Sequence, residues 1–126
     1  MKKYAGLILP LFFVIPVFLY GQMEMMIIDN TVFKSKSRSA VRFNHGNHMA
    51  LYGVSCRDCH HRFENKKNML DPVELTDDNK MIHCRYCHTG SSRLQNAYHR
   101  LCIGCHQSMI KKNLTAGPRL CGECHK

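Results

Sequence analysis

The sequence predicts a small, mostly irregular fold with a few short α-helices and one short β-hairpin, and three observations support this prediction. The chain has 126 residues, enough for one small domain. After residue 21 only about a third of the residues are apolar side chains other than Cys, and Trp is absent, which excludes a deep core made by the chain itself. Eight Cys and nine His lie after residue 44. Small domains of this kind depend on cross-links or bound groups.

The N-terminus has the layout of an export signal. Two lysines precede an apolar run, residues 7–20, and Gly21 follows as the small residue of a cleavage site. We therefore expect a signal peptide over residues 1–21 and a mature exported domain over residues 22–126. The alternative is a retained membrane anchor, but the run is shorter than the roughly 20 residues of a membrane span, and two prolines interrupt it. In both cases the cysteines lie outside the cytoplasm, where disulfides are also permitted.

All eight cysteines belong to one motif, Cys-x-x-Cys-His, which occurs four times. This motif is the attachment signature of c-type haem. Its spacing has a chemical reason: two thiols add to the two vinyl groups on one edge of the porphyrin, and the next residue reaches the iron from one face. The predicted attachment residues are Cys56, Cys59, Cys84, Cys87, Cys102, Cys105, Cys121 and Cys124, and the predicted proximal ligands are His60, His88, His106 and His125.

Two other uses of paired cysteines explain the motif less well. Two Cys-x-x-Cys units can together hold a tetrahedral zinc ion, and an exported small domain can form disulfides. Both alternatives leave four histidines, each directly after a second cysteine, without a role. The sequence therefore predicts four haem c groups. They would lie close together, because the motifs are separated by only 23, 13 and 14 residues, and their porphyrins would form the missing core.

The remaining histidines are candidates for the second axial position of each iron. A haem iron takes one ligand on each face, so four more ligands are needed. Five histidines remain, which favours bis-histidine ligation throughout. Methionine is the competing ligand, but its flexible side chain is more often packing material. The candidate histidines are His45, His48, His61, His83 and His99, and the methionines are Met49, Met69, Met81 and Met109.

The positions of these histidines suggest different roles. His83 directly precedes Cys84, so it could hardly reach the far face of its own haem, and we expect it to be the spare histidine. His61 follows a proximal ligand and must point elsewhere, which suits a neighbouring haem. His45 and His48 are three residues apart. They could serve two different haems or share one helical face.

Two segments resemble a known family. Residues 43–48, Phe-Asn-His-Gly-Asn-His, followed by the first motif and His61, are similar to the class III cytochromes c of the tetrahaem cytochrome c3 type, and residues 116–126 are similar to the smaller trihaem members. Every Cys-Cys gap here is two residues, whereas many tetrahaem members have longer gaps in two motifs, and residues 62–83 have no counterpart that we can align. The resemblance implies the ligand pairs His45 with His60, His61 with His88, His48 with His106, and His99 with His125.

The chemistry predicted for such a protein is electron transfer. With histidine on both faces of each iron no position is open to substrate, so we expect no enzymatic activity, and histidine gives a lower potential than methionine. The resemblance implies a periplasmic carrier in anaerobic respiration that accepts electrons from hydrogenase or formate dehydrogenase and passes them to membrane cytochrome complexes. The alternative is a membrane-anchored tetrahaem quinol dehydrogenase, which would retain the N-terminal anchor and have one open or weakly ligated haem. A zinc-binding interaction module would be colourless.

The positive charge does not predict a nucleic-acid partner. Lys and Arg total 18 against 9 Asp and Glu, but each haem adds two propionates, so the charge of the tetrahaem protein would be near zero. A basic cluster close to the third and fourth motifs is either an ordinary solvated surface or, as the resemblance implies, a docking patch for redox partners. It consists of Lys111, Lys112, Arg119 and Lys126.

Only a few regular elements are expected between the motifs. Residues 31–33 and 40–43 flank a polar turn and predict the short hairpin. Residues 65–79 are polar and predict a surface loop. Ser91 or Ser92 is the expected cap of a helix that includes Leu94, Tyr98, Leu101 and Ile103. Residues 108–119 are expected to be a connector.

Overall fold

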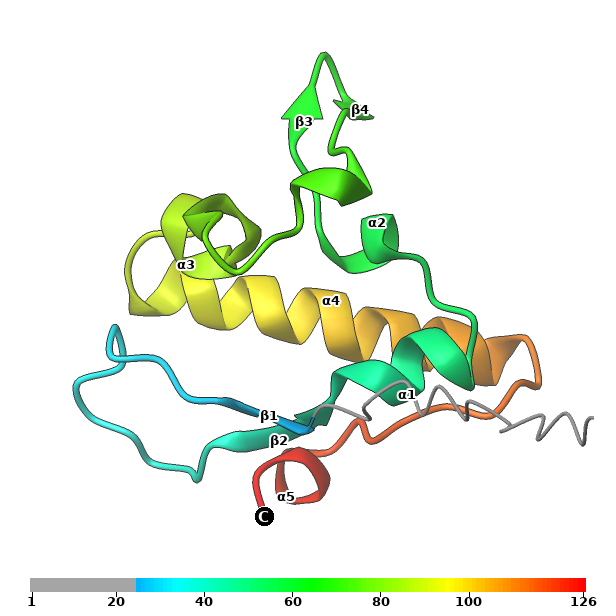
Figure 1. The fold of residues 1–126 in the computed structure, drawn as a ribbon. Coiled ribbons are helices and arrows are strands. Elements are labelled where there is room, and N and C mark those ends of the chain that lie inside the picture. The colour runs from blue at the N-terminus through cyan, green and yellow to red at the C-terminus, as the bar shows by residue number, and fades with distance from the viewer. Residues whose placement is uncertain (1–24) are drawn as a thin grey trace, which may run out of the picture.

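The computed structural model describes residues 25–126 and is arranged around one long helix, α4 (Ser91–Lys111). In Figure 1, α4 crosses the middle of the molecule. The segment between the first two motifs and helix α3 (Cys84–Cys87) lie on one side of it, and the N-terminal hairpin and the C-terminal α5 (Cys121–Cys124) lie on the other. The predicted leader, residues 1–21, lies outside the described residues. None of the helices in residues 25–126 combines the length and the apolar content that crossing a membrane requires.

The N-terminal hairpin pairs β1 (Met25–Ile28) with β2 (Val41–Asn44) in antiparallel register, with Met25 opposite Asn44. The predicted second strand is therefore correct to within one residue, whereas the predicted first strand, residues 31–33, is wrong. Residues 31–33 form a turn because Asn30 organises them: its side chain accepts the N–H of Val32 at 3.2 Å, and its carbonyl accepts that of Phe33 at 3.0 Å. Such local side-chain bonds compete with strand pairing.

Helix α1 (His45–Ala50) begins directly where β2 ends. Asn44 caps it, because the Asn44 side-chain oxygen accepts the N–H of Asn47 at 2.8 Å. This cap fixes the point at which the extended chain turns into a helix. It thereby places His45 and His48 three residues apart on one short, well-defined element.

Helix α4 is longer than the sequence predicted. The predicted serine cap is wrong: the helix begins at Ser91, its N-cap is Gly90 at φ +81°, a conformation that glycine adopts without strain, and no serine side chain caps it. It continues to Lys111, so residues 108–111 are helical instead of a connector. It ends where Asn113 takes φ +57° and Leu114 donates its N–H to Met109 O at 3.0 Å, the Schellman arrangement.

The segment between the first two motifs is exposed but ordered. It contains a two-residue ladder of β3 (Phe63–Glu64) with β4 (Lys67–Asn68), followed by the short helical turns η1 (Pro72–Glu74) and η2 (Lys80–Ile82). The prediction of a surface loop for residues 65–79 is therefore correct for the exposure of most of these residues, with the buried Leu70 as the exception, and incomplete for structure. Figure 1 shows the β3–β4 tip projecting from the rest of the molecule.

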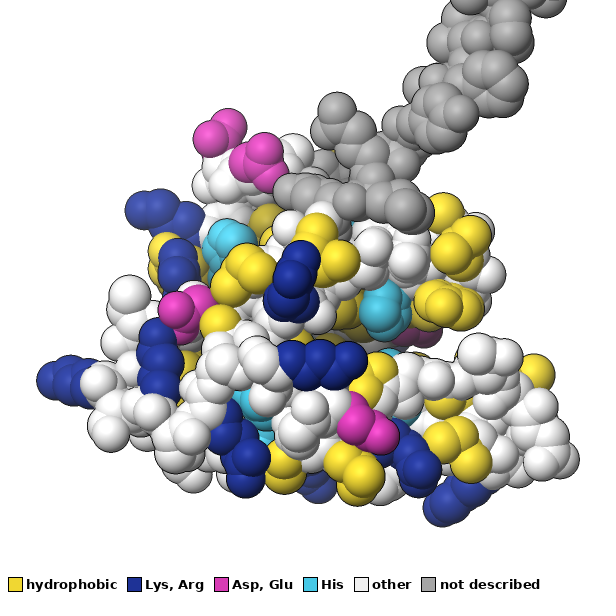
Figure 2. Space-filling view, turned by 90° about the horizontal axis from the view of Figure 1, so that it is seen from below, with side chains coloured by type: hydrophobic (Ala, Val, Ile, Leu, Met, Phe, Trp, Pro, Cys, Tyr) yellow, Lys and Arg dark blue, Asp and Glu magenta, His cyan; other side chains and the backbone are white. Residues whose placement is uncertain are grey.

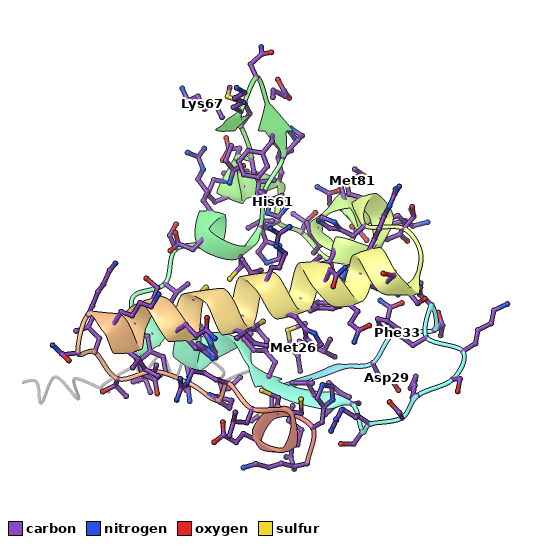
Figure 3. All side chains as sticks on the ribbon, turned by 180° about the vertical axis from the view of Figure 1, so that it is seen from behind. Met26, Asp29, Phe33, His61, Lys67 and Met81 are labelled. Carbon is purple, nitrogen blue, oxygen red and sulfur yellow. The ribbon has the colours of Figure 1, made fainter. Side chains whose placement is uncertain are left out.

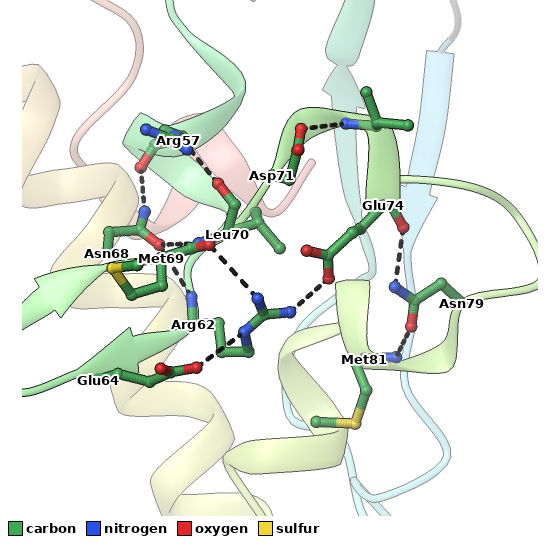
Figure 4. A network of polar contacts seen from close by, with 11 residues as sticks. Arg57, Arg62, Glu64, Asn68, Met69, Leu70, Asp71, Glu74, Asn79 and Met81 are labelled. Atoms are coloured by element: carbon green, nitrogen blue, oxygen red, sulfur yellow. Dashed lines mark hydrogen bonds and ion pairs between the residues drawn. The ribbon is translucent and has the colours of Figure 1, made fainter.

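Asn68 fastens this segment to the first motif (Figure 4). Its side-chain oxygen accepts the N–H groups of Arg62 and Leu70 at 3.0 and 3.1 Å. Its amide group donates to the carbonyls of Arg57 and His60 at 3.2 and 3.1 Å. One side chain therefore uses all its hydrogen-bonding capacity to tie the base of the β3–β4 hairpin to α2 (Cys56–Cys59).

The described chain buries almost no core of its own. Within residues 25–126 the buried hydrophobic side chains are Leu70 and Leu94, whereas large apolar side chains such as Val73, 83% exposed, and Phe63, 63% exposed, face outward. Figure 2 shows hydrophobic and histidine side chains between Lys and Arg that are spread over the face. Burial of two leucines yields only a few kcal/mol. The described residues therefore contain little apolar core, in agreement with the small core that the sequence predicted.

Candidate functional site

Three of the four Cys-x-x-Cys-His motifs form isolated helical turns, namely α2, α3 and α5, and the third motif lies inside α4. A helical turn places residues i and i+3 on the same face, so the two thiols of each motif point the same way. The histidine that follows each short turn donates its backbone N–H to the carbonyl of the first cysteine, at 2.8 Å in His60 and His88 and 2.9 Å in His125. Each motif is thus preorganised for two thioether bonds and one ligand.

Acidic side chains cap two of these turns. In α2 the Ser55 side chain accepts the N–H of Arg57, and the Asp58 carboxylate accepts the N–H of Ser55 at 2.8 Å. In α5 the Glu123 carboxylate accepts the N–H groups of Arg119 and Leu120 at 2.9 and 3.0 Å. These two hydrogen bonds lower the pKa of Glu123. The caps explain why segments of only four residues hold a helical turn.

The structure brings eight histidines together in four ring pairs. The members of each pair come from different segments of the chain, and in each pair one ring belongs to a Cys-x-x-Cys-His motif. We number the pairs by their motif: first, His45–His60, 6.4 Å between ring centroids; second, His61–His88, 6.0 Å; third, His48–His106, 6.3 Å; fourth, His99–His125, 6.5 Å.

These separations suit a metal ion held between two imidazoles. Two trans metal–nitrogen bonds of about 2.0 Å each, together with the two ring radii, separate the centroids by about 6.3 Å. Stacked rings in direct contact would lie closer, at about 4.5–5 Å, whereas edge-to-face rings in direct contact reach about 7 Å, so the separation distinguishes a bridging metal from direct contact only in the near-parallel His48–His106 pair. The donor set, two neutral imidazoles beside two thiols on one helical turn, also matches what a c-type haem requires. The residues present therefore fit the group that the motifs imply.

The second pair opens onto a groove of about 310 Å³ on α4. Its walls include His61, Cys84 and His88, and the α4 side chains Ala97, Arg100 and Leu101. His61 comes from the chain that follows α2 and points toward α4 (Figure 3). An apolar groove that contains both rings and a motif thiol is the environment that a porphyrin edge needs.

Backbone carbonyls orient four of the paired rings through Nδ1. Because a carbonyl only accepts, each of these Nδ1 atoms carries the proton, and Nε2 is left as the free electron pair for a metal. The bonds run from His48 to Asn44 O at 2.8 Å, from His60 to Ile82 O at 3.1 Å, from His106 to Pro118 O at 2.7 Å, and from His125 to Ser39 O at 2.6 Å.

Gly117 makes room for the His106 ring. A methyl group at this position would lie 2.5 Å from Cε1 of His106 and 2.8 Å from Nε2, closer than carbon atoms pack. The next residue, Pro118, supplies the carbonyl that His106 binds. The Gly117–Pro118 step thus fixes both the position and the tautomer of one ring.

All eight cysteines lie in the described part of the chain and are free thiols. Burial raises the pKa of Cys102 to about 11 and raises the pKa of Cys59 and of Cys84. These thiols are therefore neutral near pH 7, and the disulfide alternative has no pairing in the structure. Burial also lowers the pKa of His60, which favours the neutral ring that a metal binds. Within residues 25–126 no cluster of three or more His, Cys, Asp or Glu side chains is arranged to hold a metal ion alone.

The spare histidine lies apart from the four pairs. His83 is exposed, and its ring is 6.2 Å from that of Tyr86. It precedes α3 without capping it by its side chain. Of the basic cluster, Arg119 and Lys126 line a shallow hollow of about 480 Å³ together with Glu123, so this part of the surface is of mixed charge.

Sequence reasoning did not identify the backbone carbonyls, Gly117 or Arg100 as parts of the site. Every residue has a backbone carbonyl, so the residue type does not indicate which carbonyls bind a histidine ring. For Gly117 a signal does exist, since a glycine that precedes a proline, eleven residues after His106, indicates a turn or a close approach of the backbone. Arg100 is identifiable only from the helix geometry that brings it beside His61 and His88.

Two of the three comparisons with known proteins find a match. The family model of the class III cytochrome C family matches residues 23–125. Among solved structures, the chain is similar to the high-molecular weight cytochrome c from Desulfovibrio vulgaris (Miyazaki F), determined in the presence of zinc ion, with a TM-score of 0.53 and 27% identity. The match covers 86% of this chain and 22% of that one, so the chain spans less than a quarter of that protein's length. The comparison with curated proteins gives no significant match.

Proposed function

This chain belongs to the class III cytochrome c family, and from that membership and the four ring pairs we propose that it is a periplasmic, low-potential electron carrier with four haems. The family consists of electron-transfer proteins with covalently bound c-type haem. When bound, the four haems supply redox centres that each take up and release one electron. The observation that supports four of them is the coincidence of four motifs with four ring pairs.

Each proposed site uses two cysteines and two histidines. The thiols of a motif would form the thioether bonds, and the Nε2 atoms of the two rings would hold the iron. The proposed attachment residues are Cys56 and Cys59, Cys84 and Cys87, Cys102 and Cys105, and Cys121 and Cys124. The proposed axial pairs are His45–His60, His61–His88, His48–His106 and His99–His125.

The polypeptide contributes orientation and a low potential. Bis-histidine ligation favours the ferric state more than His–Met ligation does, and the Nδ1 hydrogen bonds to carbonyls hold the rings in the tautomer that binds iron. With both faces of each iron occupied, no position is left for a substrate. We therefore propose a carrier and no enzymatic activity.

The proposed partners are redox proteins of the periplasm and the membrane. As family members do, the protein would accept single electrons from hydrogenase or formate dehydrogenase and deliver them to membrane cytochrome complexes of anaerobic respiration. The surface of mixed basic and acidic groups suits short-lived encounters. We propose no nucleic-acid partner, and contact with the membrane only if the N-terminal leader is retained.

Intact mass and a visible spectrum test this function. The protein is produced with its leader in a host that exports and matures c-type cytochromes. A gain of about 2.5 kDa over the polypeptide after residue 21, with low-spin bands, is the expected result. A retained leader with a high-spin haem would instead indicate the quinol dehydrogenase. A colourless product of unchanged mass would refute haem binding.

A further inference from the structure

The third ring pair differs from the other three in the angle between its rings. The planes of His48 and His106 are 26° apart. The other pairs are close to perpendicular, at 71° for the first, 80° for the second and 83° for the fourth. For two trans imidazoles, the angle between the planes decides how the iron d orbitals split, so a near-parallel pair and a near-perpendicular pair give different ferric EPR spectra.

The pairs also differ in how many of their rings donate to a carbonyl. In the third pair both do: His48 to Asn44 O at 2.8 Å and His106 to Pro118 O at 2.7 Å. The first and fourth pairs each have one such bond, through His60 and His125. Among the hydrogen bonds of residues 25–126, neither ring of the second pair has one.

Such a hydrogen bond makes imidazole a stronger electron donor. As the N–H donates to a carbonyl, negative charge shifts toward Nε2, which stabilises the more positive ferric iron. The carbonyls of Asn44 and Pro118 act on the third site together. Both are held in place by local structure, the first by the α1 cap and the second by the contact of Gly117 with the His106 ring.

A cation acts in the opposite direction at the second site. Arg100 lines the same groove as His61 and His88. A permanent positive charge near an iron stabilises the ferrous state. Because Arg100 is exposed, water screens its charge, and the effect on the potential is modest. The second site combines this charge with rings that lack carbonyl partners.

We propose that the third ring pair stabilises ferric iron most and the second pair least, so that the second site is reduced first and the third site last. This inference rests on the proposed tetrahaem function. Each step takes one electron from a reduced redox partner and converts one ferric site to ferrous. Within the molecule, electrons would accumulate at the groove on α4 before they reach the His48–His106 site.

The unmodified tetrahaem protein gives the first test. EPR of the fully oxidised protein is expected to show one rhombic signal of the near-parallel type and three signals of the large-anisotropy type given by perpendicular rings. During a stepwise reductive titration followed by EPR and NMR, the rhombic signal is expected to disappear last. Loss of the rhombic signal before any of the others would overturn the proposal.

Gly117→Ala tests the third site directly. The added methyl pushes the His106 ring away from Pro118 O, so the rhombic signal is expected to change and this site to be reduced at an earlier stage of the titration, with a several-fold higher ferrous fraction at a fixed solution potential. Thr115→Ala is the matched control, because Thr115 is exposed, lies in the same connector two residues before Gly117 and belongs to no attachment motif. Identical titrations of the two variants would contradict the proposal.

Substitutions of Arg100 give a second test, which does not depend on whether the Gly117→Ala variant folds. Arg100→Gln is expected to delay the first reduction step, and Arg100→Lys, which keeps the charge, is expected to preserve it. An unchanged first step in Arg100→Gln would remove the second site from the proposed order. A protein with fewer than four low-spin haems would refute the proposed function itself, whereas four low-spin haems in another order would refute this inference alone.

Discussion

At the scale of single residues, the site depends on groups that have no side-chain chemistry of their own. The histidines are oriented by the carbonyls of Asn44, Ile82, Pro118 and Ser39. Residue types therefore predict which rings can hold iron, whereas backbone conformation decides how strongly each ring donates. Substitutions that move a carbonyl should alter potentials without any change of ligand.

The difference between His99 and His83 gives a prediction at this scale. His99 lies 6.5 Å from His125 in the fourth pair, whereas His83 is exposed and outside the pairs. We expect His99→Ala to retain four covalent haems but to convert one of them to a high-spin or labile state, visible by EPR and by binding of carbon monoxide. His83→Ala is expected to keep all four haems low-spin. A high-spin haem in His83→Ala but not in His99→Ala would instead make His83 the ligand and His99 the spare histidine.

The cysteines and histidines are the part of the site that can be predicted from sequence. The motif carries its own geometry, since a thiol pair at i and i+3 followed by histidine has few other uses. The pairing of His45 with His60 and of His48 with His106 does not follow from spacing, because both His45 and His48 lie on α1 within reach of several motifs. That pairing required either a family resemblance or the folded chain.

At the scale of elements, the segment between the first two motifs is the most independent part of the molecule. It has its own hydrogen-bond network (Figure 4). It contacts the site at Ile82, whose carbonyl accepts a hydrogen bond from Nδ1 of His60. The order of this segment was not predictable, because its strands are two residues long and its turns depend on the side chains of Asn68 and Asn79. Short ladders of this kind have no periodic signal.

Asn68→Ala should loosen this segment. The variant loses four hydrogen bonds of a half-buried amide, which lowers the free energy of unfolding by about 1–2 kcal/mol. Chemical denaturation of the holoprotein measures the loss, and hydrogen exchange should localise it to residues 62–82. Asn96→Ala, at an exposed position of α4, is the control and is expected to change stability little. An equal loss in both variants would contradict the role of Asn68.

The ion pair of Arg62 with Glu74 predicts a pH dependence in the same segment. The side-chain hydrogen bond from Arg62 lowers the pKa of Glu74. The stabilisation is therefore complete above the ordinary glutamate pKa and is lost as the pH falls through the lowered value. NMR titration of the carboxyl group of Glu74 in the reduced protein should show this, and Arg62→Gln should return the pKa to its ordinary range. If the pKa of Glu74 were the same in Arg62→Gln as in the unmodified protein, the ion pair with Arg62 would not be its cause.

The N-terminal hairpin shows why strand prediction was only half correct. Val41 to Asn44 ends at a helix cap, which is a recognisable signal, whereas Met25 to Ile28 is a uniform apolar run without alternation. Residues 31–33 have more strand-like composition, but the hydrogen bonds of Asn30 hold them in a turn. Local polar bonds outweighed strand propensity here.

At the scale of the whole molecule, the polypeptide surrounds its cofactors instead of a core. Leu70 and Leu94 are its buried apolar side chains in residues 25–126. A domain of this size normally buries many more apolar side chains than two. Composition predicted this lack of core, whereas the proposal that porphyrins fill it comes from the Cys-x-x-Cys-His motifs.

The chain without haem is therefore expected to be unfolded. If the protein is produced without its leader in a host that leaves the motifs unmodified, far-UV circular dichroism should show little helix, and the NMR spectrum should have narrow amide dispersion. The exported holoprotein is the control and should show the α4 helix and a cooperative thermal transition. A cooperative transition in the haem-free chain would mean that the polypeptide folds by itself.

The third ring pair has a consequence for the order of assembly. His48 and His106 are 58 residues apart, so in a chain exported with its N-terminus first there is an interval in which His48 is outside the cytoplasm and His106 is not. In that interval the motif at Cys56–Cys59 is already available, and His48 competes with His45 for the iron of the first site. Under the proposed ligation, we therefore expect misligated forms, in which His45 and His48 are exchanged, to mature slowly. Proline isomers and non-native disulfides slow the folding of other proteins in a comparable way.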